Sequence, residues 1–221
     1  MREKYFNKGN LPHKFQNFLS SYPSDYSLSI DEIEWKNIGL VILDMQQCFL
    51  NPSSHAFVPS SPSIVAGQVA LSELFKKKKL PVFCTRHINN IGYEGMMAYW
   101  WKNLITENNE HSKLIPEIQN IEAPVYHKQE YDAFYKTGLE EVLNNNGIKK
   151  LIVTGVMTHL CVETTVRSAF VRGFQPILPV NGTATYNEEF HKASLVNLSH
   201  GFAILTTMEV LINSLRSAII E

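Results

Sequence analysis

Short apolar runs rich in β-branched residues alternate with longer amphipathic segments along most of this chain. Six runs have the length of buried strands, at residues 38–43, 81–85, 124–127, 150–155, 176–180 and 202–206. Between and after them, apolar residues take the wider spacing of helices, at residues 64–77, 139–146, 164–172, 188–198 and 208–214. Strands that are apolar on both faces and alternate with helices are typical of a parallel sheet covered on both sides. The pattern predicts an α/β fold, a Rossmann-like three-layer sandwich around a six-stranded, mostly parallel sheet.

The chain has 221 residues, enough for one domain with a full core. Residues 1–36 are polar and aromatic and are interrupted by Pro12 and Pro23, so we expect an N-terminal arm that lies on the domain or on a neighbouring subunit. Residues 37–221 then form the domain. Residues 89–122 are too long for a simple connection and hold Trp100 and Trp101, so they are either a lid or binding wall, or core or subunit interface.

Charge and cysteine usage narrow the class of function. The 20 Lys and Arg residues nearly balance the 21 Asp and Glu residues, and no basic stripe appears, so we expect a small-molecule ligand rather than nucleic acid or a membrane. No signal, anchor or bilayer-length apolar run is visible. The three widely spaced cysteines fit reduced thiols in a cytoplasm and lack zinc-ligand spacing.

Four reactive side chains follow predicted strands. In chain order they are Asp44, His87, Lys128 and Cys161, the last lying shortly after Gly155. Each alone has a structural explanation, such as a helix cap for an aspartate or a core position for a cysteine. Because ligands of an open parallel sheet bind beyond the carboxyl ends of its strands, their shared position indicates one site.

Cys161 stands between a buried strand and the helix that follows it. The free backbone N–H groups and dipole of a helix start, together with a nearby lysine, are expected to favour its thiolate. The same N–H groups can receive an oxyanion when a thiolate attacks a carbonyl. Asp44 can take the thiol proton and return it to the leaving group. We interpret Cys48 and Cys84 as structural, because both lie in or beside predicted core segments.

Three segments resemble the isochorismatase-like hydrolases, the superfamily that includes nicotinamidases and carbamoylsarcosine amidohydrolase. They are Leu-Asp-Met-Gln at 43–46, Lys-Gln-Glu-Tyr-Asp-Ala-Phe at 128–134 and Gly-Val-Met-Thr-His-Leu-Cys-Val-Glu-Thr-Thr at 155–165, within a likeness from about residue 38 to 215. The resemblance implies a catalytic triad of Asp44, Lys128 and Cys161. It also implies a cis peptide between Val156 and Met157 that turns the N–H groups of Met157 and Cys161 toward the oxyanion.

The leading hypothesis is hydrolysis of a C–N bond in a small amide, carbamoyl or ureido compound through a thioester. Its pocket wall is predicted to include His87, Trp101, Tyr131 and Phe134, which flank the rim. One alternative is vinyl ether hydrolysis by Asp44, and another is a binding protein without turnover. Relatives that cleave the vinyl ether of isochorismate carry glycine at the position of Cys161 and arginine at that of Glu94, so this chain departs from both.

The resemblance also bears on cofactors and partners. Nicotinamidases usually carry a metal-binding aspartate and histidines after the second strand, but His87 lacks an accompanying aspartate. We therefore expect no metal and no cofactor, and nicotinamide becomes a weaker candidate. The aromatic arm and the resemblance favour a homodimer or homotetramer that acts on a small molecule.

Overall fold

A parallel sheet forms the centre of the molecule. The computed structural model describes residues 1–14, 19, 33–92, 95–101 and 103–219. The strand order is β3-β2-β1-β4-β5-β7, with β6 beside β4, and every pairing is parallel. The strands are β1 (Ile38–Leu43), β2 (Val82–His87), β3 (Val125–Lys128), β4 (Lys150–Val156), β5 (Gln175–Pro179), β6 (Thr183–Ala184) and β7 (Ile204–Thr206). The predicted fold class is confirmed, and β6 is an additional short strand.

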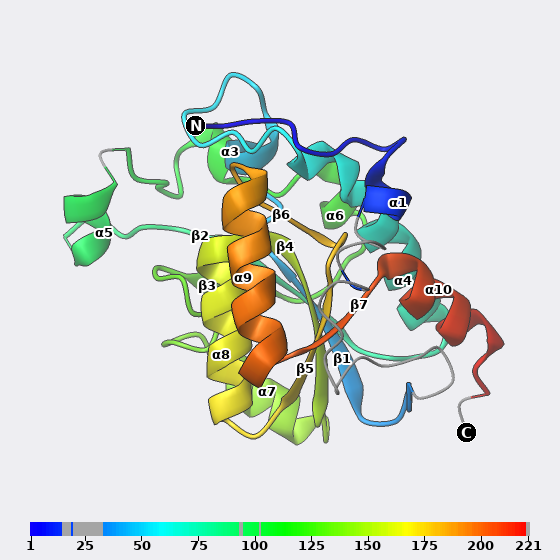
Figure 1. The fold of residues 1–221 in the computed structure, drawn as a ribbon. Coiled ribbons are helices and arrows are strands. Elements are labelled where there is room, and N and C mark those ends of the chain that lie inside the picture. Colours follow the sequence, from blue (N-terminus) through cyan, green and yellow to red (C-terminus); the bar gives the residue numbers. More distant parts are fainter. Residues whose placement is uncertain (15–18, 20–32, 93–94, 102, 220–221) are drawn as a thin grey trace.

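Helices cover both faces of the sheet (Figure 1). On one face α4 (Val65–Lys77) packs against α10 (Met208–Ser217), and on the other α8 (Glu163–Val171) packs against α9 (Glu188–Gly201). The remaining helices are short: α1 (Leu11–Lys14), α3 (Gln47–Leu50), η2 (Ser61–Ser63), α5 (Met96–Trp100), η3 (Glu110–Ser112), α6 (Pro116–Gln119), α7 (Leu139–Asn145) and η4 (Thr158–Val162). Within the described ranges, no helix combines the length and apolar character needed to cross a membrane.

The centre of the sheet is where the strand order reverses. From β1 the chain crosses through α4 to β2 on one side, and from β4 it crosses through α8 to β5 on the other. Every residue of β1 is buried, and β4 is buried beyond its first residue, which explains their continuous apolar runs. Because the connections after β1 and β4 diverge, a crevice opens beyond the carboxyl ends of these two strands.

The first residues of the arm lie against the domain of the same chain. Tyr5 and Phe6 are buried, and the Tyr5 hydroxyl accepts a 3.0 Å hydrogen bond from the backbone N–H of Thr185. The backbone N–H of Glu3 donates to the carbonyl of Tyr186 at 2.8 Å. This part of the arm is therefore held beside the start of α9. Pro23 and Glu94, which were named in the sequence analysis, lie outside the described residues.

Gly155 permits the close approach of β1 and β4 at the site. Its φ is +114°, and a Cβ placed there would lie 2.1 Å from the carbonyl oxygen of Leu43. We expect Gly155→Ala to lower the free energy of unfolding by more than about 2 kcal/mol, because both the conformation and the neighbouring strand resist a side chain. Urea unfolding measures this difference.

Gly147 provides the control. It also has a positive φ, +67°, but a Cβ there would meet no atom within 4 Å. Gly147→Ala should lower the free energy of unfolding only by the cost of holding alanine in the left-handed conformation, about 1 to 2 kcal/mol. Equal losses for the two variants would contradict the close contact at Gly155.

Candidate active site

Asp44 ends β1 in an unusual backbone conformation. Its φ is +54°, in the left-handed region that most side chains avoid, and such conformations are concentrated at functional sites. Thr85, on the adjacent strand β2, fixes the carboxylate by donating from its hydroxyl to Oδ1 at 2.7 Å. The backbone N–H of Asp44 lies 3.2 Å from the same hydroxyl oxygen. The carboxylate is therefore held in one orientation, with Oδ2 facing the other reactive groups.

Lys128 ends β3 and reaches across β2 to that carboxylate. Its Nζ lies 2.7 Å from Oδ2 of Asp44, and both side chains are fully buried. Oδ2 makes this ion pair but no hydrogen bond of good geometry with any described residue. Burial alone would lower the pKa of Lys128, but the interactions of its ammonium group with Asp44 and Cys161 outweigh burial and leave this pKa raised. Lys128 is therefore an ammonium group.

Cys161 lies in η4, a single π-helical turn between β4 and α8. Its Sγ is 3.2 Å from Nζ of Lys128, and the side chain is 4% exposed. Burial raises the pKa of the Cys161 thiol to about 12, although Lys128 acts to lower it. The expectation that the resting site favours thiolate is therefore wrong, because desolvation, together with the nearby Asp44 carboxylate, outweighs the effect of Lys128. The peptide bond between Val156 and Met157, just before η4, is cis.

His87 ends β2 beside this group as a neutral imidazole. Its Nδ1 lies 3.5 Å from Nζ of Lys128. Burial, and secondarily the charge of Lys128, lower the pKa of His87 to about 4. Gln46 clamps its backbone, accepting from the His87 N–H at 2.7 Å and donating to the His87 carbonyl at 3.1 Å. The histidine thus offers a fixed, uncharged polar surface at neutral pH.

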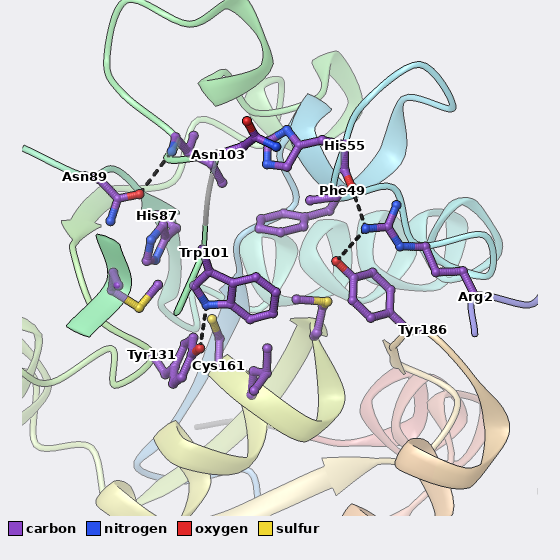
Figure 2. A pocket seen from close by; sticks show the side chains of 15 residues that line it. Arg2, Phe49, His55, His87, Asn89, Trp101, Asn103, Tyr131, Cys161 and Tyr186 are labelled. Carbon is purple, nitrogen blue, oxygen red and sulfur yellow. Dashed lines mark hydrogen bonds between the residues drawn. The ribbon is translucent and has the colours of Figure 1, made fainter. Parts of the chain in front are cut away.

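A cavity of about 90 Å³ opens over Cys161 (Figure 2). Three predicted wall residues line it, His87, Trp101 and Tyr131. The indole Nε1–H of Trp101 donates to the Tyr131 hydroxyl at 2.7 Å, so these two rings form one side of the cavity. Met157 and Cys161, whose backbone N–H groups are the predicted oxyanion donors, line it as well. Their roles in binding and catalysis stay predictions.

Phe134 is a correction to the predicted wall. Its ring stacks on Phe174 at 5.7 Å between centroids, and the guanidinium of Arg172 lies over it at 5.0 Å. The turn after β3, where Asp132 accepts from the Phe134 N–H, carries this ring into the core instead of the cavity. Proximity to Tyr131 in sequence was therefore misleading.

Several residues of the site were not predicted. Thr85 and Gln46 hold Asp44 and His87 in place, and Gln46 belongs to the segment 43–46 that carried the family resemblance. Arg2 and Tyr186 line the cavity from the arm and from the loop before α9. No local pattern points to these last two, because 184 positions separate them.

The segment 89–122 contributes both a wall and an exposed surface. Met97 and Trp101 line the cavity, which supports the binding-wall interpretation for these two residues. Trp100 is 67% exposed, and Met96 and Tyr99 are exposed too. Trp100 is therefore not a core residue.

The described residues around the cavity offer few ligands for a metal ion. In the parts of the chain that the structure describes, no three His, Cys, Asp or Glu side chains cluster so as to hold one. At the cavity, His55 and His87 are the histidines among the lining residues, and no described carboxylate joins them there. The donor set around this cavity does not fit a metal centre.

Alkylation tests the protonation of Cys161. Because its pKa is raised to about 12, the thiol should react with iodoacetamide at pH 7 roughly 100-fold or more slowly than free cysteine, with a rate that still rises at pH 9. Removing the ammonium in Lys128→Met should slow the reaction further. Peptide mass spectrometry resolves Cys161 from Cys48 and Cys84. A Cys161 rate that levels off below pH 7 would contradict the protonated resting thiol.

Burial of His87 makes folding sensitive to acid. The unfolded chain binds a proton at this group near pH 6.5, whereas the folded chain does so only near pH 4. The folded protein therefore keeps its full free energy of unfolding, as far as His87 is concerned, above about pH 6.5. This free energy decreases as the pH falls toward 4. His87→Asn should lose roughly 2 kcal/mol less unfolding free energy between pH 7 and pH 5 than wild type, in urea titrations. An identical loss in both proteins is the outcome that argues against a buried neutral imidazole.

Comparison with protein families and curated proteins gives consistent matches. The isochorismatase domain family matches residues 39–210. Nicotinamidase 3 of Arabidopsis thaliana is 37% identical over 185 residues, which cover 81% of this chain and 89% of that protein. N-carbamoylsarcosine amidase of Arthrobacter sp. is 30% identical over 150 residues, covering 64% of this chain and 57% of the relative. Enterobactin synthase component B of Escherichia coli K12 is 26% identical and is covered over 63% of its length.

Solved structures share the fold. A cysteine hydrolase from Pseudomonas syringae pv. phaseolicola superposes with a TM-score of 0.80 at 22% identity, covering 90% of this chain and all of that one. A pyrazinamidase/nicotinamidase from Streptococcus mutans gives 0.71 at 18% identity, over 76% of this chain and 99% of that one. With the domain match and the Arabidopsis relative, these findings show that the chain belongs to the isochorismatase family of hydrolases.

Proposed function

We propose that this hydrolase cleaves the C–N bond of a small amide, carbamoyl or ureido compound through a thioester on Cys161. The observation that carries the proposal is the contact chain at the cavity floor, in which Sγ of Cys161 lies 3.2 Å from Lys128 and Lys128 lies 2.7 Å from Asp44. A nucleophile, a base and a cation are thereby in contact beside a small cavity. Amide cleavage is also what the names of Nicotinamidase 3 and N-carbamoylsarcosine amidase state for those relatives.

In the first half of the proposed reaction, the thiol proton of Cys161 passes to Asp44 as Sγ bonds to the substrate carbonyl carbon. The carbonyl oxygen becomes an oxyanion, which the backbone N–H groups of Met157 and Cys161 are proposed to receive. The C–N bond then breaks while Asp44 gives its proton to the departing nitrogen. Ammonia or an amine leaves, and the acyl group stays on sulfur as a thioester.

In the second half, water enters the place that the amine vacated. Asp44 takes a proton from this water, and the oxygen bonds to the thioester carbon. The C–S bond breaks as the proton returns to sulfur, which releases the carboxylic or carbamic acid and restores the thiol. Lys128 remains an ammonium group throughout and offsets whichever of its neighbours carries negative charge.

A protonated resting thiol is compatible with this chemistry. The raised pKa of Cys161 means that no free thiolate accumulates in the empty site. The proton need only move to the adjacent carboxylate during attack, when the new C–S bond and the oxyanion donors share the negative charge. A protonated thiol would also protect the enzyme from unwanted alkylation and oxidation between turnovers.

Substitution of the triad distinguishes this mechanism from its alternatives. With an amide that wild type turns over, from a panel including nicotinamide and N-carbamoylsarcosine, Cys161→Ala and Asp44→Asn should each lower kcat/KM by roughly 1,000-fold or more. Cys84→Ala, which removes another buried thiol on β2, should retain activity. Melting temperatures establish that each variant is folded.

Each alternative has its own result. If Cys161→Ala keeps its activity while Asp44→Asn loses it, with isochorismate as substrate, the vinyl ether mechanism replaces the thioester. If folded wild type turns over neither the amides nor isochorismate, the binding-protein alternative is favoured.

A further inference from the structure

Arg2 is the one residue with a permanently charged side chain among the described residues that line the cavity. The other lining residues are apolar or carry neutral polar groups, such as Phe49, Asn89, Trp101 and Leu160. Arg2 comes from the N-terminal arm, which precedes the matched domain. Figure 2 shows it beside Tyr186, while Trp101 and Tyr131 lie together next to Cys161.

Contacts with neighbouring residues hold the guanidinium of Arg2 in place but leave some of its N–H groups without an acceptor among the described residues. It lies 4.5 Å from the ring centroid of Tyr186, and its Nη2 donates to the Tyr186 hydroxyl at 3.3 Å and to the carbonyl of His55. The Glu3 backbone bond to Tyr186 and the burial of Tyr5 fix the adjoining chain. Among the described residues, Nε and Nη1 have no hydrogen-bond acceptor, and no carboxylate is within ion-pair distance of Arg2.

The charges around the cavity do not cancel that of Arg2. The Lys128 ammonium and the Asp44 carboxylate offset each other, and Cys161 is a neutral thiol. Burial lowers the pKa values of both His55 and His87, so neither adds positive charge at neutral pH. Among the described residues that line the cavity, the positive charge of Arg2 is therefore uncompensated, and its guanidinium can still donate hydrogen bonds. Such a group favours an anionic ligand.

We propose that Arg2 binds a carboxylate of the substrate while Cys161 attacks its amide, so that the preferred substrates are amido acids rather than neutral amides. This inference rests on the proposed function and adds the class of substrate. Arginine suits this role because it is always charged and presents several N–H donors to a carboxylate. The N-terminal arm then takes part in substrate selection in addition to covering the domain.

A matched series of compounds tests the proposal. Oxamate, malonamate, succinamate and glutaramate differ from the corresponding diamides only by a carboxylate in place of one amide. After allowing for the two amides of each diamide, wild type should prefer the acid of the best length by roughly 10- to 100-fold in kcat/KM. Arg2→Gln should abolish this preference by lowering kcat/KM for the acids far more than for the diamides, and Arg2→Lys should restore part of it.

Lys4→Gln is the matched control, because it removes an exposed cation from the same arm outside the cavity lining. It should leave both series unchanged. If Arg2→Gln lowers kcat/KM for the acids and for the diamides equally, Arg2 has only a structural role and the proposal is overturned. A wild type that prefers diamides would overturn it too.

Alkylation of Cys161 tests the same charge without turnover. Iodoacetate and iodoacetamide differ by the same carboxylate-to-amide exchange, and their rate ratio at pH 8.5 can be measured by peptide mass spectrometry. Arg2→Gln should lower the iodoacetate-to-iodoacetamide ratio several-fold, whereas Lys4→Gln should not. An unchanged ratio in Arg2→Gln counts against the proposal. If the ratio falls in Arg2→Gln but the wild type hydrolyses no amide, the result would support an anion site at Arg2 and contradict the proposed amide hydrolysis.

Discussion

The buried ion pair between Lys128 and Asp44 is the interaction on which the site depends. Each side chain is fully buried, so each charge is stable only because the other is 2.7 Å away. Removing one partner of such a pair typically lowers the free energy of unfolding by about 3 to 5 kcal/mol, because the remaining buried charge has neither a partner nor water around it. The pair also spans β2, joining the ends of β1 and β3. The same contact thus links the sheet geometry to the position of a base and a cation beside Cys161.

The sheet supplies the remaining geometry through close backbone contacts. Gly155 lets β4 approach β1 at the point where Asp44 leaves the strand, and Thr85 then orients the carboxylate from β2. Gln46 ties the loop after β1 to the end of β2 through two hydrogen bonds to His87. These residues hold the reactive groups in one orientation relative to each other, although those groups come from four separate segments.

Much of this arrangement could be predicted from the sequence. The predicted strands and main helices agree with the structure to within a few residues at most, because long apolar runs and helical spacing are strong signals. Asp44, His87, Lys128 and Cys161 meet as their positions after strands predict. The two-residue β6 was missed, since a strand of that length leaves no periodic pattern. Phe134 was misplaced because a turn, and not sequence proximity, decides where its ring packs.

Two further properties of the site depend on the folded environment. The neutral state of Cys161 follows from desolvation, which cannot be judged from a helix start and a nearby lysine alone. The position of Arg2 follows from long-range contacts of the arm with His55 and Tyr186. In both cases the chemistry of the residue was visible in the sequence, but its surroundings were not.

The most direct test of the central claim is the mass of the enzyme during a single turnover. Enzyme in excess is mixed with an amide that it hydrolyses, quenched in acid at successive times, and analysed as intact protein and as the peptide that contains Cys161. The account predicts a transient increase equal to the substrate mass less that of the departing ammonia or amine, located on Cys161. An unmodified Cys161 peptide at every time while the amide is consumed would contradict the thioester mechanism.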